Sequence, residues 1–213
     1  MQQHQTAKRI VAVVAALAAA GVAVAQGQVV GWGLSNGVPQ PAIPSMLRYT
    51  QVAAGAGVTY ALRSDGTITA FLASSGILQN LSGVQQIAAG VNHAYALRVD
   101  GSLVGEGYPY SGQLATPANV GAVAQVACGL DYTLALRVDG TVLGWGRNWY
   151  GETSIPSGLS DVRQIACNSY HAYALKRDGT AVGWGRGDPW GQTSTPIGLS
   201  GVSQIACGEN HNY

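Results

Sequence analysis

The sequence predicts an all-β fold, a β-propeller built from blades of three to four short antiparallel strands. Three observations lead to this prediction. A motif of about 39 residues repeats along the chain, an Asp-Gly pair recurs in the same register, and the 213 residues include 30 glycines but one phenylalanine. Abundant glycine with regularly spaced turn signals favours many short strands over long amphipathic helices.

The repeat is marked by a Gln-apolar-Ala step, which we expect to open each blade. Its copies begin at Gln51, Gln86, Gln125, Gln164 and Gln204, which stand 35, 39, 39 and 40 residues apart. Periods of this length indicate a propeller or a solenoid, and three antiparallel strands per unit suit a blade better than a solenoid coil. The first unit is four residues shorter than the next, and Thr67–Phe71 replaces its third-strand motif, so we expect this blade to lack the usual loop.

Each unit contains three expected strands, illustrated by the unit that begins at Gln164. These strands are Gln164–Cys167, His171–Lys176 and Thr180–Trp184. The Asp178-Gly179 pair between the last two predicts a type I′ hairpin turn, because both central positions of that turn need a positive φ, which Asp-Gly tolerates. Equivalent pairs stand at residues 65–66, 100–101 and 139–140.

The middle strand of each unit is expected to be buried on both faces. In the unit that begins at Gln164, Ala172 and Ala174 point to one side of the sheet, and Tyr173 and Leu175 point to the other. One face is therefore small and the other large. Stacked units would bury both faces if the large face of one blade fills against the small face of the next.

The motifs around these strands resemble those of a known family. Cys-Gly, then His or Tyr, Ala-Leu, Asp-Gly, Gly-Trp-Gly (144–146, 183–185) and a following Gly-Gln or Gly-Glu (112–113, 151–152, 191–192) recur in register. Together they resemble the repeat of the regulator of chromosome condensation (RCC1) family over nearly all of the chain after residue 25. The compact period is closer to the secreted bacterial branch typified by β-lactamase inhibitor protein II. The resemblance implies a seven-bladed propeller that works through a protein-binding face.

Residues 1–25 have the layout of a secretory signal peptide. Lys8 and Arg9 precede an uncharged apolar run, Ile10–Ala25, which ends on the small-residue pattern Ala-Val-Ala. We expect cleavage before Gln26, which predicts a secreted or periplasmic protein with one repeat domain at residues 26–213. A membrane anchor is the alternative, but the run is Ala-rich and shorter than the roughly 20 strongly apolar residues that span a bilayer.

Both ends of the predicted domain lie within a repeat. Val29–Gly33 matches only a third strand, and the unit that begins at Gln204 stops at Tyr213, before any Asp-Gly pair. In a closed ring the N-terminal strand would complete the last sheet. We expect instead about four and a half blades of the implied seven, an incomplete propeller truncated at its C-terminus.

Composition limits the partners and the chemistry that we expect. The formal net charge is +1 and 10% of residues are charged, against a norm of about 25%. No basic face is available for a phosphate backbone, so we predict no nucleic-acid partner, and no membrane contact after signal cleavage. No nucleophile elbow, phosphate loop or zinc signature occurs, so we predict neither an enzyme nor a cofactor nor a metal site.

The segments that follow each third strand vary between units, and we expect them to bind a protein partner. Equivalent propeller loops emerge on one rim, and Tyr, Trp and Arg dominate binding hot spots. The candidate residues are Tyr108, Tyr110, Arg147, Trp149, Tyr150, Arg186, Asp188 and Trp190. The alternative is that each aromatic ring folds back over its own blade.

Two other function classes stay open. One is a surface scaffold or adhesion module. The other is a secreted enzyme acting on polysaccharide, with Glu106 or Asp188 in the central cleft, which a pair of carboxylates about 5 to 10 Å apart would favour. Glu106 stands where other units have the Trp of Gly-Trp-Gly, and we expect it to be exposed to solvent at a splayed strand end, with a functional acid as the alternative.

Cysteine and histidine each recur at one position of the repeat. Cys128, Cys167 and Cys207 share the position of Ala54 and Ala89, which predicts small buried thiols that are free; an intermolecular disulfide or a metal is the alternative. The histidines share their position with Tyr132 and Val58; they are His93, His171 and His211. This exchange favours a hydrogen bond from imidazole to a turn backbone over metal binding.

Overall fold

The fold is all-β in the part of the chain that the computed structural model describes. That part comprises residues 20–25, 28–35, 38–39, 49–55, 58–71, 76–187, 191–208 and 211–212, the first three segments as backbone only. Its elements are β1 (Ala20–Ala25), β2 (Gln28–Ser35), β3 (Val38–Pro39), β4 (Tyr49–Ala54), β5 (Thr59–Arg63), β6 (Ile68–Phe71), η1 (Leu78–Asn80), β7 (Val84–Ala89), β8 (His93–Arg98), β9 (Leu103–Gly107), β10 (Val123–Cys128), β11 (Tyr132–Arg137), β12 (Val142–Gly146), β13 (Val162–Cys167), β14 (His171–Lys176) and β15 (Ala181–Gly185). None of these described elements is a helix long and apolar enough to span a membrane.

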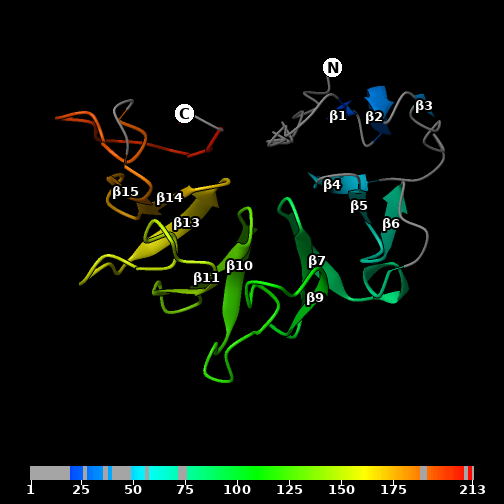
Figure 1. Cartoon of the computed structure of the whole chain (residues 1–213), viewed down its shortest axis with the longest axis horizontal. Helices are drawn as coiled ribbons and strands as arrows, with labels where there is room; N and C mark the ends of the chain where they lie inside the picture. Colours follow the sequence, from blue (N-terminus) through cyan, green and yellow to red (C-terminus); the bar gives the residue numbers. More distant parts are fainter. Residues whose placement is uncertain are drawn as a thin grey trace, which may run out of the picture.

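The strands form five three-stranded sheets, each made of three consecutive antiparallel strands. The sheets follow one another around an open arc, with β1–β3 and the segment after β15 at its two ends (Figure 1). The first strand of each of the four sheets from β4 to β15 faces the centre of the arc and lines a shared channel. This arrangement is the predicted β-propeller, with each sheet as one blade.

The blades pack large face against small face, as the alternation in the middle strand predicts. Tyr60 and Leu62 of β5 lie in one apolar cluster with Ala94 and Ala96 of β8. The next junctions repeat the pattern between β8 and β11 and between β11 and β14. The first five residues of each of these three strands are buried, so each middle strand belongs to two interfaces at once.

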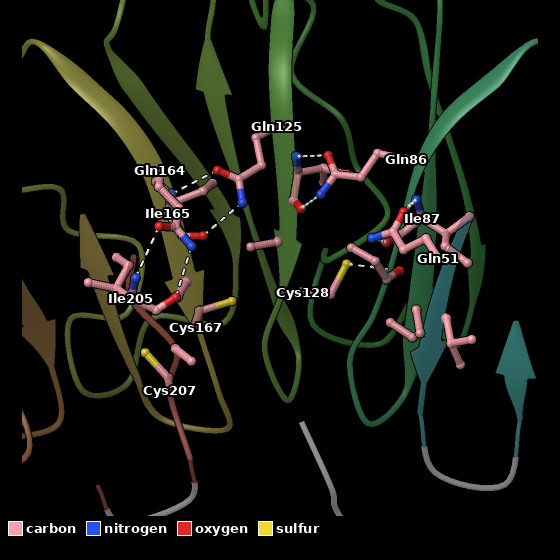
Figure 2. A pocket seen from close by; sticks show the side chains of 18 of the residues that line it. Gln51, Gln86, Ile87, Gln125, Cys128, Gln164, Ile165, Cys167, Ile205 and Cys207 are labelled. Carbon is pink, nitrogen blue, oxygen red and sulfur yellow. Dashed lines mark hydrogen bonds between the residues drawn. The ribbon is translucent and has the colours of Figure 1, made fainter. Parts of the chain in front are cut away.

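Glutamine side chains join the inner strands of neighbouring blades (Figure 2). Gln86 Nε2 donates to the Val126 carbonyl at 2.9 Å, and Gln86 Oε1 accepts the Val126 N–H at 2.9 Å. The same paired bonds, all between 2.8 and 3.0 Å, link Gln51 to Ile87, Gln125 to Ile165 and Gln164 to Ile205. Each Gln therefore satisfies a backbone donor and acceptor that the edge of the next sheet would otherwise leave unpaired.

The Asp-Gly hairpins differ from the predicted type I′ turn. Only the glycine has a positive φ, for example +82° at Gly179, and the preceding Asp does not. The Gly179 N–H donates to the Lys176 carbonyl at 3.1 Å, and the Lys176 N–H donates to the Thr180 carbonyl at 2.8 Å, so the turn is a type I turn closed by a left-handed glycine. Asp178 acts through its side chain, because its Oδ1 accepts the Thr180 N–H at 2.9 Å. The Asp178 carboxylate also accepts a hydrogen bond from the Thr180 side chain. This bond has the largest effect, and together with the bonds from the Thr180 N–H and the Lys176 side chain it lowers the pKa of Asp178 to about 2.

The N-terminal copy of Gly-Trp-Gly lies elsewhere than predicted. Val29–Gly33 matched a third strand, but β2 is the middle strand of its sheet and pairs with both β1 and β3. β1 consists of the last residues of the predicted signal peptide, which are uncharged and near enough in sequence to form a hairpin with β2. Cleavage before Gln26 stays a prediction, and it would remove β1 from this sheet.

The three cysteines line the channel, which has a volume of about 330 Å³: Cys128 ends β10, Cys167 ends β13, and Cys207 lies in the segment after β15. None of them forms a disulfide within the described part of the chain, and the alternative of an intermolecular disulfide stays open. Cys128 and Cys207 are buried and Cys167 is half-buried. Burial raises the pKa of all three thiols, that of Cys207 to about 12, and therefore disfavours the reactive thiolate.

Replacing one bridging glutamine should destabilise the propeller more than replacing its neighbour. Gln86→Ala leaves the Val126 N–H and carbonyl without partners, so we expect the free energy of unfolding to fall by about 2 kcal/mol or more. Gln85→Ala, on the same strand, removes one exposed bond to the Arg98 carbonyl and should cost less than about 1 kcal/mol. Urea denaturation of both variants measures the difference; equal losses would contradict the bridging role.

The cysteine thiols of the folded protein should react slowly with a thiol reagent. We expect slow reaction with a disulfide reagent at pH 8, because the raised pKa values leave little thiolate, and reaction of three groups per chain after denaturation without reductant. Absorbance of the released chromophore follows both steps. Only one reactive group in the denatured chain would show that two cysteines had been joined.

Candidate binding face

One end of the blades carries the segments that we expected to bind a partner. There the turn between the first and second strands of a blade meets the residue that leaves the third strand. The N–H of Tyr108 donates to the Asn92 carbonyl at 2.9 Å, and the N–H of Arg147 donates to the Asp131 carbonyl at 2.8 Å. Arg186 and Tyr170 form the third such pair, also at 2.9 Å. We call this end the binding face; its residues are Asn92, Tyr108, Tyr110, Asp131, Arg147, Trp149, Tyr150, Tyr170 and Arg186.

Four aromatic side chains of the binding face are exposed. Tyr110 is 87% exposed and Trp149 78%, and Tyr108 and Tyr150 are exposed as well. Tyr108 and Tyr110 stack on each other, with ring centroids 5.9 Å apart and ring planes 11° apart. These four rings are exposed, and partner binding through them stays a prediction.

Arg147 is buried, in contrast to its expected place on the exposed rim. It is 7% exposed, and its Nη2 lies 3.3 Å from Oε1 of Glu152, which has no exposed surface. Its Nη1 lies 3.6 Å from Oδ2 of Asp131. The guanidinium also lies 4.8 Å from the centroid of the Trp149 ring and 5.1 Å from that of Tyr170. Buried Arg147 therefore packs against the rings of Trp149 and Tyr170 and helps to hold them in place.

The buried ion pair follows from one change in the repeat. Gln113, at the position of Glu152 one blade earlier, donates from its amide to the Tyr108 carbonyl and accepts the Ser111 N–H at 2.8 Å. Glu152 keeps the acceptor role, toward the Tyr150 N–H at 2.7 Å, but a carboxylate has no hydrogen to donate. The Arg147 guanidinium supplies donors in that blade, through Nε and Nη2.

Arg186 occupies the same position one blade later and is exposed. Its guanidinium lies 5.2 Å from the centroid of Tyr150 and 5.5 Å from that of Tyr170, and these two rings meet edge to face at 5.8 Å. No ion pair of Arg186 occurs among the residues that the structure describes. Asp188 and Trp190, which we also predicted for this rim, lie outside the described residues.

Sequence reasoning missed the turn residues of the binding face. Asn92, Asp131 and Tyr170 share one position between the first and second strands, and Asn92 donates to Asp131 across the blade junction at 2.8 Å. The signal was present in the sequence, because residues 91–92, 130–131 and 169–170 differ between units while the strands on either side of them repeat. Variable positions in a repeat that is otherwise copied indicate a surface free to specialise.

His93 and His171 form hydrogen bonds across a blade junction, which the sequence did not predict. His93 Nε2 lies 2.8 Å from Thr133 Oγ1 on the next middle strand, and His171 Nε2 lies 2.8 Å from Asn212 Oδ1. Burial lowers the pKa of His93 to about 4, so this imidazole is neutral at pH 7. No three His, Cys, Asp or Glu side chains of the described residues are grouped so as to hold a metal ion.

Glu106 is neither exposed at a splayed strand end nor part of the central channel. Its Oε1 accepts a hydrogen bond from the Tyr60 hydroxyl, and its Oε2 accepts the Leu78 N–H at 2.9 Å. Trp145, at the equivalent position, instead donates from Nε1 to the Gln113 carbonyl at 2.9 Å. The described residues that line the channel include no carboxylate, so they give no support to the enzyme alternative there.

Comparisons with known proteins agree with the propeller. The sequence model of the regulator of chromosome condensation (RCC1) repeat matches residues 123–152 and 162–188. A search of the curated proteins with this sequence finds no match.

Solved propellers resemble the chain in fold at low identity. The ectodomain of the receptor kinase CR4 from Physcomitrella patens has 18% identity, a TM-score of 0.70 and coverage of 89% of this chain and 54% of that one. Prp20p from Saccharomyces cerevisiae, described with its binding to Gsp1p and histones, has 20% identity, a TM-score of 0.67 and coverage of 84% and 57%. Yeast RCC1 (Prp20), in its structure with Kap60, has 18% identity, a TM-score of 0.67 and coverage of 89% of this chain and 64% of that one. The chain thus spans less than two thirds of each of these proteins.

Arg147 and Glu152 should behave as one unit in stability measurements. Arg147→Ala leaves the Glu152 carboxylate buried without a cation, and we expect the free energy of unfolding to fall by about 3 kcal/mol. Adding Glu152→Gln should recover most of this loss, because Gln113 fills the same position in the preceding blade. Urea denaturation of the single and double variants gives the coupling free energy.

The exposed pair of Lys176 and Asp178 provides the control. Its side chains are 30% and 51% exposed, so Lys176→Ala should change the free energy of unfolding by less than about 1 kcal/mol. A double variant as unstable as Arg147→Ala alone would show that the two residues are not coupled.

Proposed function

We propose that this chain is a secreted protein-binding module that holds its partner on the binding face. The observation that carries the proposal is the set of exposed aromatic side chains at one end of the blades, led by Tyr110 and Trp149. Tyr and Trp are enriched among residues that dominate protein–protein binding, because they bury a large area and lose little conformational freedom. The Gln-linked blades present them from a rigid support.

The binding face is also pre-organised. Trp149 lies over the Arg147 guanidinium, which is fixed in turn by buried Glu152. Tyr108 and Tyr110 stack, and Tyr150 meets Tyr170 edge to face. Rings already held in place cost less entropy on binding, so more of the contact energy appears as affinity.

The comparisons support a binding role by analogy of fold alone. Prp20p is described as binding Gsp1p and histones, and its structure has also been solved with Kap60 bound. Propellers host many activities, so this likeness supports protein binding but does not identify the partner. Secretion in this proposal rests on the layout of residues 1–25, and likeness to the secreted bacterial branch on the short repeat period.

Removing single rings from the binding face should weaken partner binding and leave the fold intact. The protein is first used to capture its partner from the native secretome. We then expect Trp149→Ala and Tyr110→Ala each to weaken binding by about 2 kcal/mol, as for a hot-spot residue. Calorimetric titration measures affinity, and thermal melting checks the fold.

Val99→Ala and Val138→Ala are matched controls. These side chains are 71% and 64% exposed in the hairpin turns at the opposite end of the blades, and should leave affinity unchanged. Equal losses at both ends, or none at the aromatic positions, would contradict the proposal.

A further inference from the structure

A pocket of about 120 Å³ lies at one blade junction, beside the binding face. It is situated between the sheet β4–β6 and the sheet β7–β9. Residues from both sheets line it, including Val58, Tyr60, Ala94, Glu106, Gly107 and Tyr108. Since Tyr108 stacks on exposed Tyr110, the pocket adjoins one of the aromatic pairs that we propose for partner binding.

The pocket exists because two rings of the repeat are missing at this junction. Val58 stands where other units have His93, Tyr132 or His171, whose rings reach the next blade. Glu106 stands where later units have a tryptophan that fills the space beside the middle strand. Ala94 on the facing strand is too small to replace either ring.

The Glu106 carboxylate on the pocket wall has hydrogen bonds but no counter-ion. Its two partners are the Tyr60 hydroxyl and the Leu78 N–H, and both of these are neutral. None of the ion pairs of the described residues includes Glu106. His93 also lines the pocket, but its imidazole is neutral at pH 7 because burial lowers its pKa.

We propose that this pocket receives a lysine or arginine side chain of the protein partner. The proposal rests on the function proposed above and specifies the partner's chemistry at one point of contact. The walls formed by Val58 and Ala94 suit the aliphatic stem of such a side chain, and Glu106 supplies the opposite charge. The Tyr108 ring beside the pocket adds a surface that attracts cations.

The pocket can be tested without the partner, using small organic cations on the full chain. n-Butylammonium represents lysine, n-propylguanidinium represents arginine, and n-butanol is the uncharged control. The Leu78 amide signal reports binding, because this N–H donates to Glu106. We expect a Kd on the order of millimolar for at least one cation, as suits a ligand of so few atoms, and at least tenfold weaker binding of n-butanol.

Three variants separate the pocket from general charge effects. Glu106→Gln keeps an acceptor for Leu78 and removes the charge, and Val58→Tyr fills the pocket with the ring that Tyr132 supplies elsewhere. Each should weaken cation binding at least tenfold. Asp161→Asn removes one charge from an exposed residue with a positive φ of 58°, which Asn tolerates, and should leave binding unchanged.

The partner then distinguishes the two proposals. Glu106→Gln and Val58→Tyr should each lower its affinity at least tenfold, while Trp149→Ala lowers partner affinity and leaves n-butylammonium binding unchanged. The pocket proposal would be overturned if the cations bound no more tightly than n-butanol. It would also be overturned if Glu106→Gln and Val58→Tyr both folded and bound the cations as tightly as the unchanged protein. Partner affinity that survives both variants would overturn it as well, whereas partner affinity that survives loss of the aromatic rings would overturn the proposed function alone.

Discussion

The structure depends on how one blade is joined to the next at the centre of the arc. An inner strand pairs with its own sheet on one side only, so its other edge carries backbone groups that need partners. One glutamine per blade supplies both a donor and an acceptor to the residue after the next glutamine. With the blades joined in this way, the large face of one middle strand packs against the small face of the next.

Departures from the repeat are compensated by the polar groups around them. A carboxylate replaces an amide at Glu152, and Arg147 supplies the donors that the carboxylate lacks. A carboxylate replaces an indole at Glu106, and the Leu78 N–H and the Tyr60 hydroxyl supply its hydrogen bonds. The first case buries both charges together, while the second leaves a charge beside an open pocket. A carboxylate in place of a neutral side chain thus holds Arg147 beneath the exposed rings in the Glu152 blade, and it provides a candidate recognition site in the Glu106 blade.

The two ends of the blades differ for a physical reason. At one end every hairpin has an Asp whose side chain accepts a backbone hydrogen bond, followed by a glycine with a positive φ. The sequence of these hairpins is therefore constrained by turn geometry. At the other end the segments that leave the third strands differ in sequence from blade to blade, although the first residue of each bonds to the turn beside it. Exposed tyrosine and tryptophan accumulate at the variable end, which is why we place the partner there.

The sequence by itself determined the propeller, the three antiparallel strands of a unit, the bounds of the middle strand His171–Lys176, and the large and small faces of the middle strands. These features follow from local rules, because side-chain alternation, turn glycines and a shared repeat position are visible in a single unit. Even there the hairpin type was wrong, since Asp-Gly also fits a longer turn in which only Gly has a positive φ. Only the tertiary structure decided that Arg147 is buried, that Tyr170 joins the binding face and that a pocket opens at Glu106. Each of these depends on contacts between side chains of different strands, turns and blades, which side-chain alternation and turn residues within one unit do not specify.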